Sequence, residues 1–143
     1  MIEVLLLGGT GAMGTFLVDI LAKSKINCVV TSRSKKNSCN YVTYICGNAK
    51  DDTFLFPLLE SRHWSSIIDF MSYSTEEFAN RFQTLLKCTD QYVYLSSSRV
   101  YANSETPLKE SSPRLLDSCS DKEYLSTDEY ALSKARQENL LLS

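Results

Sequence analysis

The sequence predicts an α/β domain built on a doubly wound parallel sheet. Along its 143 residues, short apolar runs alternate with stretches in which apolar residues recur at helical spacing. This alternation indicates right-handed βαβ units, in which helices cover both faces of a parallel sheet. The apolar runs are continuous, as is typical of strands buried on both faces. We therefore expect a Rossmann-type sheet with the strand order 3-2-1-4-5.

Five strands and four helices are expected along the chain. The strands are predicted over residues 2–7, 28–31, 41–46, 67–70 and 92–96. The helices are predicted over residues 11–24, 51–62, 75–88 and 128–142. In the first helix, an apolar stripe of Met13, Phe16, Leu17, Ile20 and Leu21 sets the helical spacing.

Two features interrupt this pattern. Pro57 lies inside the second predicted helix and predicts a break or a kink there. Residues 98–127 lack a periodic pattern and contain Pro107 and Pro113. Connections of this length without regular structure are uncommon and are typical of functional loops, with a disordered insertion as the alternative.

Composition and charge exclude several classes of protein. The net charge is −2, from 15 basic and 17 acidic residues, which does not favour a nucleic-acid partner. The longest apolar run is Val4–Leu7, so we expect no membrane span, and the first residues do not resemble a secretory signal. The five cysteines are scattered without a CxxC pair, and the only histidine has no cysteine at ligand spacing. We therefore expect no metal site, no disulfide framework and a cytoplasmic location.

Four of the five glycines lie where the first strand meets the first helix: Gly8, Gly9, Gly11 and Gly14. A phosphate-binding turn needs glycines there, so that the backbone can turn sharply and approach a pyrophosphate. The following helix then supplies free N–H groups and the positive end of its dipole. The pattern is therefore interpreted as a dinucleotide-binding turn, with a tight turn that binds no ligand as the alternative.

The end of the second strand favours a cofactor with a 2′-phosphate. An acidic residue there would bind the adenosine ribose hydroxyls, but residues 31–36 contain no carboxylate. They contain instead Ser32 and the cations Arg33, Lys35 and Lys36. This composition favours NADP over NAD, although NAD stays possible and a solvated basic loop is the alternative.

Tyr130 and Lys134 are four residues apart on the last predicted helix and should share one face. A lysine beside a tyrosine favours the tyrosinate, which can exchange a proton with a substrate hydroxyl. Taken alone, the pair is better explained as two ordinary exposed side chains on a helix surface. The fifth strand, however, ends in Ser96, Ser97 and Ser98, at the sheet edge where open α/β sheets place ligands.

Three motifs in this order resemble the extended short-chain dehydrogenase/reductase superfamily, namely its NAD-dependent epimerase/dehydratase family of sugar-nucleotide enzymes. The motifs span residues 7–14 (LGGTGAMG), 92–101 (YVYLSSSRVY) and 130–134 (YALSK). The resemblance implies that Ser97, Tyr130 and Lys134 are catalytic, with Lys134 lowering the tyrosine pKa and binding the nicotinamide ribose. The cofactor-binding residues that it implies are Gly8, Thr10, Gly11, Ala12, Met13, Gly14, Ser32, Arg33, Asn48, Met71, Tyr130 and Lys134.

The sequence departs from that family in three places. Family dehydratases carry an Asp-Glu pair directly after the catalytic hydroxyl residue, where this chain has Ser98 and Arg99, so dehydration is disfavoured. The loop at 69–73 is bulkier than the family's alanine-rich loop. The chain ends nine residues after Lys134, where family members continue into a substrate domain. We therefore expect residues 1–143 to be an N-terminal Rossmann part of a longer protein, with uncovered apolar faces that promote self-association.

These inferences give two hypotheses for the function. The first is an NADP-preferring oxidoreductase or epimerase that acts on a sugar nucleotide by hydride transfer, with Tyr130 as the acid/base. The alternative is a non-catalytic dinucleotide-binding module with a regulatory or scaffold role. The intact set of serine, tyrosine and lysine favours the enzyme. A homodimer through the helices at 75–88 and 128–142 is also possible by resemblance to the family.

Overall fold

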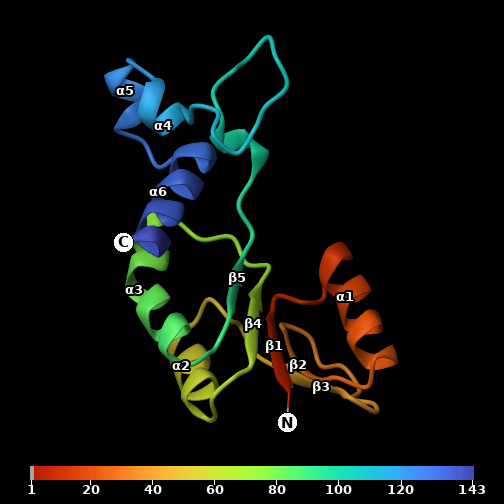
Figure 1. The fold of residues 1–143 in the computed structure, drawn as a ribbon. Helices are drawn as coiled ribbons and strands as arrows, with labels where there is room; N and C mark the ends of the chain where they lie inside the picture. Colours follow the sequence, from red (N-terminus) through yellow and green to blue (C-terminus); the bar gives the residue numbers. More distant parts are fainter. Residues whose placement is uncertain (1) are drawn as a thin grey trace. The chain divides into compact units, whose positions relative to one another are not determined.

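The structure is a computed structural model that describes residues 2–143, and it contains a five-stranded sheet of order β3-β2-β1-β4-β5 (Figure 1). All neighbouring strands are parallel. The strands are β1 (Glu3–Leu7), β2 (Asn27–Ser32), β3 (Val42–Cys46), β4 (Ser66–Asp69) and β5 (Tyr92–Tyr94). The predicted fold class and strand order are confirmed.

Four longer helices occur close to the predicted positions, with three short helical segments between the third and the last of them. The longer helices are α1 (Ala12–Lys23), α2 (Asp52–Glu60), α3 (Thr75–Lys87) and α6 (Tyr130–Leu142). The short segments are the 3-10 turn η1 (Ser98–Val100), α4 (Leu115–Ser118) and α5 (Lys122–Leu125). Within residues 2–143, no helix is both long and apolar enough to cross a membrane.

The chain forms two compact units. We call residues 2–72 and 83–95 the sheet unit, and residues 73–82 and 96–143 the helical unit. The boundary falls within α3, whose first half belongs to the helical unit and whose second half belongs to the sheet unit.

Apolar strands form the centre of the sheet unit. Leu5, Leu6, Leu7, Val30 and Ile67 are completely buried, which explains why the runs are continuous rather than alternating. On one side of the sheet lies α1, and on the other lie α2 and the second half of α3 (Figure 1). This arrangement leaves the carboxyl ends of the strands at one edge, where the loops that line the site begin.

The break predicted at Pro57 is wrong, because α2 runs without interruption from Asp52 to Glu60. Pro57 cannot donate a backbone hydrogen bond to Thr53, so the helix loses one of its internal hydrogen bonds. Two completely buried leucines, Leu55 and Leu59, hold the helix against the sheet on either side of the proline.

The apolar stripe predicted for the first helix points in two directions. Gly14 and Val18 are buried, whereas Met13, Phe16 and Ile20 are 64%, 75% and 50% exposed. The connection from β2 to β3 forms no helix, so no second helix from this connection covers α1. The outer face of α1 is therefore apolar and uncovered by the part of the chain that the structure describes.

Residues 98–127 are more regular than the sequence predicts, because η1, α4 and α5 fall within them. Each helix has only three or four residues, too few to produce a periodic pattern. The capping of α5 is clear in the structure, since the side chain of Asp121 accepts hydrogen bonds from the N–H groups of Glu123 and Tyr124.

Candidate cofactor pocket and catalytic side chains

Between β1 and α1, a Cβ added at Gly8, Gly9 or Gly14 would lie less than 3.0 Å from another atom. Gly8 has a φ of +68°, and a Cβ there would lie 2.7 Å from the Sδ atom of Met71. A Cβ at Gly14 would lie 2.6 Å from the backbone of Gly9, which cannot move aside as a flexible side chain can. The N–H of Gly8 donates to Oγ1 of Thr31, which joins the turn to β2. The glycines therefore bring the first turn of α1 directly onto the end of β1.

The N-terminus of α1 is open. Gly11 is the N-cap residue, and no side chain caps the helix. A Cβ added at Gly11 would have no atom within 4 Å, so space lies next to the backbone there. Backbone N–H groups of a first helical turn have no partner within the helix, and they form an anion-binding site when a ligand can approach them.

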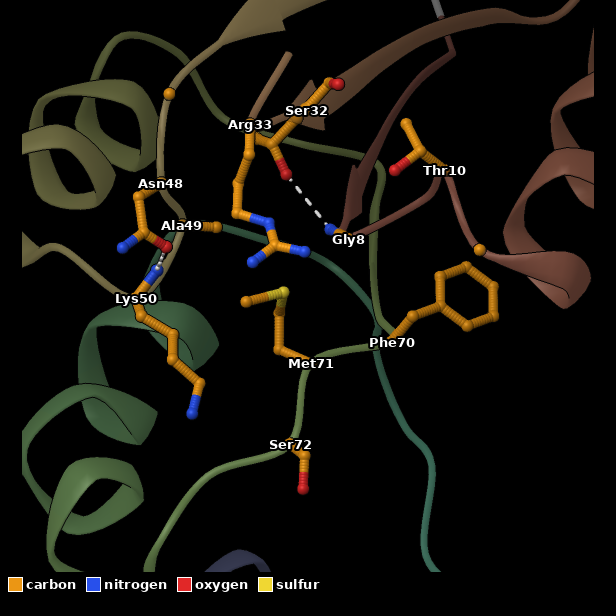
Figure 2. Close-up of a pocket in the computed structure, with 13 residues that line it drawn as sticks. Gly8, Thr10, Ser32, Arg33, Asn48, Ala49, Lys50, Phe70, Met71 and Ser72 are labelled. Carbon is orange, nitrogen blue, oxygen red and sulfur yellow. Dashed lines mark hydrogen bonds between the residues drawn. The ribbon is translucent and has the colours of Figure 1, made fainter.

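A cavity of about 520 Å³ adjoins this turn at the carboxyl ends of β1, β2, β3 and β4 (Figure 2). Its position matches the edge where open α/β sheets bind ligands. It is lined by Gly8, Thr10, Gly11, Thr31, Ser32, Arg33, Gly47, Asn48, Ala49, Lys50, Phe70, Met71 and Ser72. No aspartate or glutamate is among these lining residues.

The cavity lining contains two cations, Arg33 from the end of β2 and Lys50 from the loop after β3 (Figure 2). Arg33 was predicted from the sequence. Lys50 was missed, although it lies only two residues after the predicted Asn48 and its N–H donates to the Asn48 Oδ1 atom. A cation close to a predicted cofactor-binding residue is the signal that could have identified it.

Seven of the ten cofactor residues predicted in the sheet unit line the cavity: Gly8, Thr10, Gly11, Ser32, Arg33, Asn48 and Met71. The other three, Ala12, Met13 and Gly14, lie on α1 outside the cavity lining. Gly14 packs closely against the backbone of Gly9 and so helps to form the turn. Met13 belongs to the exposed outer face of the helix.

A buried carboxylate holds the bulky loop after β4 in place. Asp69 is 1% exposed, and its Oδ1 atom accepts the N–H of Met71. Its Oδ2 atom accepts the hydroxyl of Tyr92 from β5. The loop that looked too bulky for the family is thus fixed to two neighbouring strands, with Met71 against the glycine turn.

In the helical unit, Tyr130 and Lys134 share one face of α6, as predicted. Tyr130 is the first residue of the helix and is 41% exposed, whereas Lys134 is 4% exposed. The Nζ atom of Lys134 lies 5.9 Å from the centroid of the Tyr130 ring. Ser97 precedes η1, and its Oγ atom accepts the N–H of Arg99. The hydroxyl proton of Ser97 can therefore point to another acceptor.

A second cation, Arg99, faces the tyrosine. Its guanidinium carbon lies 5.4 Å from the centroid of the Tyr130 ring, and its Nη2 atom lies 2.7 Å from Oε1 of Glu129. The N–H of Ala131 and the hydroxyl of Tyr124 also bind Glu129, and together with Arg99 they hold the pKa of its carboxyl below the ordinary value. The sequence had suggested no positive role for Arg99.

Polar side chains anchor α6 to the segment that begins at Tyr73. The completely buried Gln137 donates to the carbonyl of Tyr73 and to Oγ of Ser133, both at 2.8 Å. Asp128, just before the helix, accepts the N–H of Thr75 at 2.9 Å. This network fixes the rotation of α6 and hence the direction in which Tyr130 and Lys134 leave the helix.

The chain was compared with protein families, with curated proteins and with solved structures. No family model matches the sequence, and no curated protein matches it. Three of the similar solved structures, with their identities to this chain, TM-scores and coverages, are as follows. The UDP-Glc/GlcNAc 4-epimerase from Campylobacter jejuni is 18% identical with a TM-score of 0.77, over 99% of this chain and 48% of that one. The Bordetella bronchiseptica enzyme WbmH, in complex with NAD⁺, is 17% identical with a TM-score of 0.74, over 99% and 52%. The UDP-glucose 4-epimerase from Bifidobacterium longum, in complex with NAD⁺ and UDP, is 20% identical with a TM-score of 0.69, over 98% and 48%.

These similarities concern the fold. The predicted resemblance to sugar-nucleotide epimerases is confirmed at that level, because nearly the whole chain superposes on such enzymes. The chain spans about half the length of these solved structures. The chain thus has a Rossmann-type fold, which these nucleotide-sugar epimerase structures share.

Proposed function

We propose that this chain is the cofactor-binding and proton-transferring part of an NADP-preferring oxidoreductase or epimerase that acts on a sugar nucleotide. The observation that carries the proposal is the cavity at the carboxyl ends of β1 to β4, where an uncapped helix N-terminus meets two cations and no carboxylate. Solved structures of similar fold that contain NAD⁺, one of them a UDP-glucose 4-epimerase, support it.

The lining residues fit a nicotinamide dinucleotide. The open backbone at Gly11 and the first turn of α1 would hold the pyrophosphate. Arg33 and Lys50, with Ser32, would bind a 2′-phosphate on the adenosine ribose, and Asn48 would contact the adenine. The absence of a carboxylate from the lining favours NADP, because a carboxylate is the usual partner of a free 2′-hydroxyl. The bound cofactor supplies the hydride acceptor and donor.

The helical unit supplies the proton chemistry. The phenol of Tyr130 exchanges a proton with the substrate oxygen, and Ser97 donates a hydrogen bond to the same oxygen. Lys134 and Arg99 both face the Tyr130 ring, so each stabilises the negative charge that the phenol oxygen carries after it gives up its proton. Because Ser98 and Arg99 provide no carboxylate next to Ser97, the proposed reaction is oxidation, reduction or epimerisation rather than loss of water.

The test has two readouts in the presence of sugar nucleotides. The absorbance of the reduced nicotinamide follows net oxidation or reduction, and conversion of the sugar nucleotide to its epimer follows epimerisation, which leaves no net reduced cofactor. Tyr130→Phe should lower the rate about 10²-fold or more, because general acid–base catalysis contributes that much. The matched control is Tyr41→Phe, since Tyr41 and Tyr130 are both 41% exposed. An equal rate in wild type and Tyr130→Phe would contradict the assigned role.

The same assay separates the two hypotheses. A folded chain that binds NADP⁺ but transfers no hydride to or from any sugar nucleotide tested would favour the non-catalytic regulatory or scaffold module. The homodimer through residues 75–88 and 128–142 and the cytoplasmic location stay predictions.

A further inference from the structure

A second cavity, of about 400 Å³, lies in the helical unit between η1 and the start of α6. It is lined by Ser98, Arg99, Tyr101, Ala102, Asn103, Ser104, Leu108, Leu115, Tyr124 and Ala131. Arg99 is the only charged residue among them. The other polar groups are hydroxyls and one amide, so the cavity combines neutral hydrogen-bonding groups with a single positive charge.

Two nitrogens of the Arg99 guanidinium have N–H groups that bind no acceptor within residues 2–143. Its side chain is 63% exposed, and Nη2 is the guanidinium nitrogen that pairs with Glu129. The Nε and Nη1 atoms have no hydrogen-bond acceptor among residues 2–143. A guanidinium presents its N–H groups as a fixed fork that matches the two oxygens of a carboxylate. The part of the fork turned away from Glu129 is therefore available to an anionic ligand.

The structure holds Arg99 in place before any ligand arrives. Its backbone N–H is bound by the Ser97 hydroxyl oxygen at 3.2 Å, and its guanidinium stacks on the Tyr130 ring. Glu129, which fixes the guanidinium, is itself held by the N–H of Ala131 and the hydroxyl of Tyr124. Such preorganisation lowers the entropy cost of binding, because the side chain is already oriented.

We propose that Arg99 binds a carboxylate on the sugar of the substrate, so that the substrate class is a nucleotide-linked uronic acid. This inference rests on the proposed function, in which Ser97 and Tyr130 hold the reacting oxygen. The backbone N–H of Arg99 binds the Ser97 hydroxyl oxygen, and its guanidinium lies against the Tyr130 ring, so the free part of the guanidinium is offered to a substituent close to the oxygen that Tyr130 would protonate. A neutral sugar would leave the spare donors of Arg99 without an anionic partner, whereas a carboxylate satisfies them.

The nucleotide diphosphate is the other anion on such a substrate. In a uronic acid, the carboxylate is joined to the carbon next to C4, whereas the diphosphate is joined to the anomeric carbon across the ring. In the 4-epimerases of similar fold the reaction is at C4, and a guanidinium against the Tyr130 ring at such a position is nearer to the carboxylate than to the diphosphate. The experiment below separates these two anions.

The test follows the Arg99 Nε–Hε signal in ¹H–¹⁵N spectra of the whole chain during titration with small probes. Glucuronate should shift this signal in a saturable way, whereas glucuronamide, which lacks the charge, should not. In the variants, which lack this signal, binding is followed by the backbone amide signal of Ala131 in the same cavity lining. Arg99→Gln should weaken glucuronate binding about ten-fold or more, as expected for loss of a charge-assisted hydrogen bond. Arg99→Lys keeps the charge without the fork and should lie between wild type and Arg99→Gln.

The matched control is Arg62→Gln. Arg62 also pairs with one carboxylate, at 3.0 Å from Glu3, and also stacks on an aromatic ring, at 5.2 Å from the Trp64 centroid. Its replacement should leave glucuronate binding unchanged. Circular dichroism of each variant tests whether it is folded. If Arg99→Gln does not fold, the titration of Arg99→Lys still tests the role of the guanidinium.

Two results would overturn the inference. The first is an Arg99 signal that does not respond to glucuronate at saturating concentration. The second is a signal that responds to inorganic phosphate and not to glucuronate, which would assign Arg99 to the diphosphate. Binding of NADPH, measured in the same samples, reports separately on the proposed function, so failure of one can be told from failure of the other.

Discussion

The two units of the chain position their functional groups in different ways. In the sheet unit, buried apolar strands bring backbone groups and short loops to one edge, and the cations Arg33 and Lys50 lie on exposed loops there. In the helical unit, side chains do the positioning, through bonds such as those of Gln137 to Ser133 and to the carbonyl of Tyr73. Backbone positioning tolerates changes of side chain but not of glycine, whereas a side-chain network depends on each of its members.

The largest expected effect is at Gly14 in the sheet unit. Gly14→Ala would place a Cβ 2.6 Å from the Gly9 backbone, so the turn must shift, at a cost of about 1–3 kcal/mol in the free energy of unfolding. Urea denaturation followed by circular dichroism measures this change in the free energy of unfolding. Wild-type stability in this variant would mean that backbone contact does not hold the turn.

Gly11→Ala is the matched variant, because a Cβ at Gly11 meets no atom within 4 Å. Its stability should change by less than about 1 kcal/mol. Its affinity for NADPH should nevertheless fall about ten-fold or more, because the methyl group occupies the space beside the first turn of α1. The pair separates the folding role of the glycines from their binding role.

The helical unit should depend in the same way on Gln137. Gln137→Leu removes both donors while filling a similar volume, and it leaves buried oxygens with fewer partners, at a cost of about 1–3 kcal/mol. Gln83→Leu, on the exposed side of α3, is the control and should change stability by no more than about 0.5 kcal/mol. If the two variants unfolded alike in urea, the side-chain network would not be what holds α6.

A smaller effect on the free energy of unfolding is expected at acidic pH, where Asp128 becomes protonated. Burial alone would raise the pKa of its carboxyl, but hydrogen bonds from Thr75 and the charge of Arg136 outweigh it and hold the pKa below the ordinary value. A lowered pKa in the folded state means that the ionised form stabilises the fold above the unfolded pKa of about 3.9. This contribution is lost as the pH falls through the folded pKa.

The prediction is that Asp128→Asn removes part of the acid dependence of the unfolding free energy. Because the Asp128 side chain is 40% exposed, the difference should be less than about 1 kcal/mol. Asp19→Asn, on the exposed side of α1, is the comparison variant. Unfolding curves measured from neutral to acidic pH should converge at low pH for Asp128→Asn and wild type. Parallel curves would show that Asp128 contributes nothing.

The smallest effect on stability is expected on the outer face of α1. Phe16→Ser replaces a side chain that is 75% exposed, so the free energy of unfolding should change by no more than about 0.5 kcal/mol. Self-association measured by sedimentation should decrease, because the largest exposed apolar side chain of that face is removed. A large loss of stability would instead place Phe16 in the core.

The sheet unit was largely predictable from the sequence, and the helical unit less so. Buried strands leave a direct pattern, as in Val4–Leu7, and the glycines at the first turn leave another. The Tyr130 and Lys134 pair was found because a helix places residues four apart on one face. Gln137 left no such pattern, since its partner Tyr73 lies 64 residues away in the sequence.

The exposed cations were harder to predict for a different reason. Lys50 and Arg99 occur in short loops and turns, where no periodicity indicates which way a side chain points. The direction of the α1 stripe was also undetermined, because both of its faces are apolar and only packing shows which one is buried. Local patterns thus give the strands and helices, whereas long-range contacts determine which polar and apolar groups face a cavity.

The central claim is that the sheet unit binds a nicotinamide dinucleotide through its 2′-phosphate. The most direct measurement is a fluorescence titration of the folded chain with NADPH and with NADH, repeated on Arg33→Asp. We predict that NADPH binds about ten-fold or more tightly than NADH, and that Arg33→Asp abolishes the preference while NADH still binds. Equal affinities in the wild type would contradict the 2′-phosphate assignment. Binding of neither cofactor by the folded chain would contradict the assignment of the cavity itself.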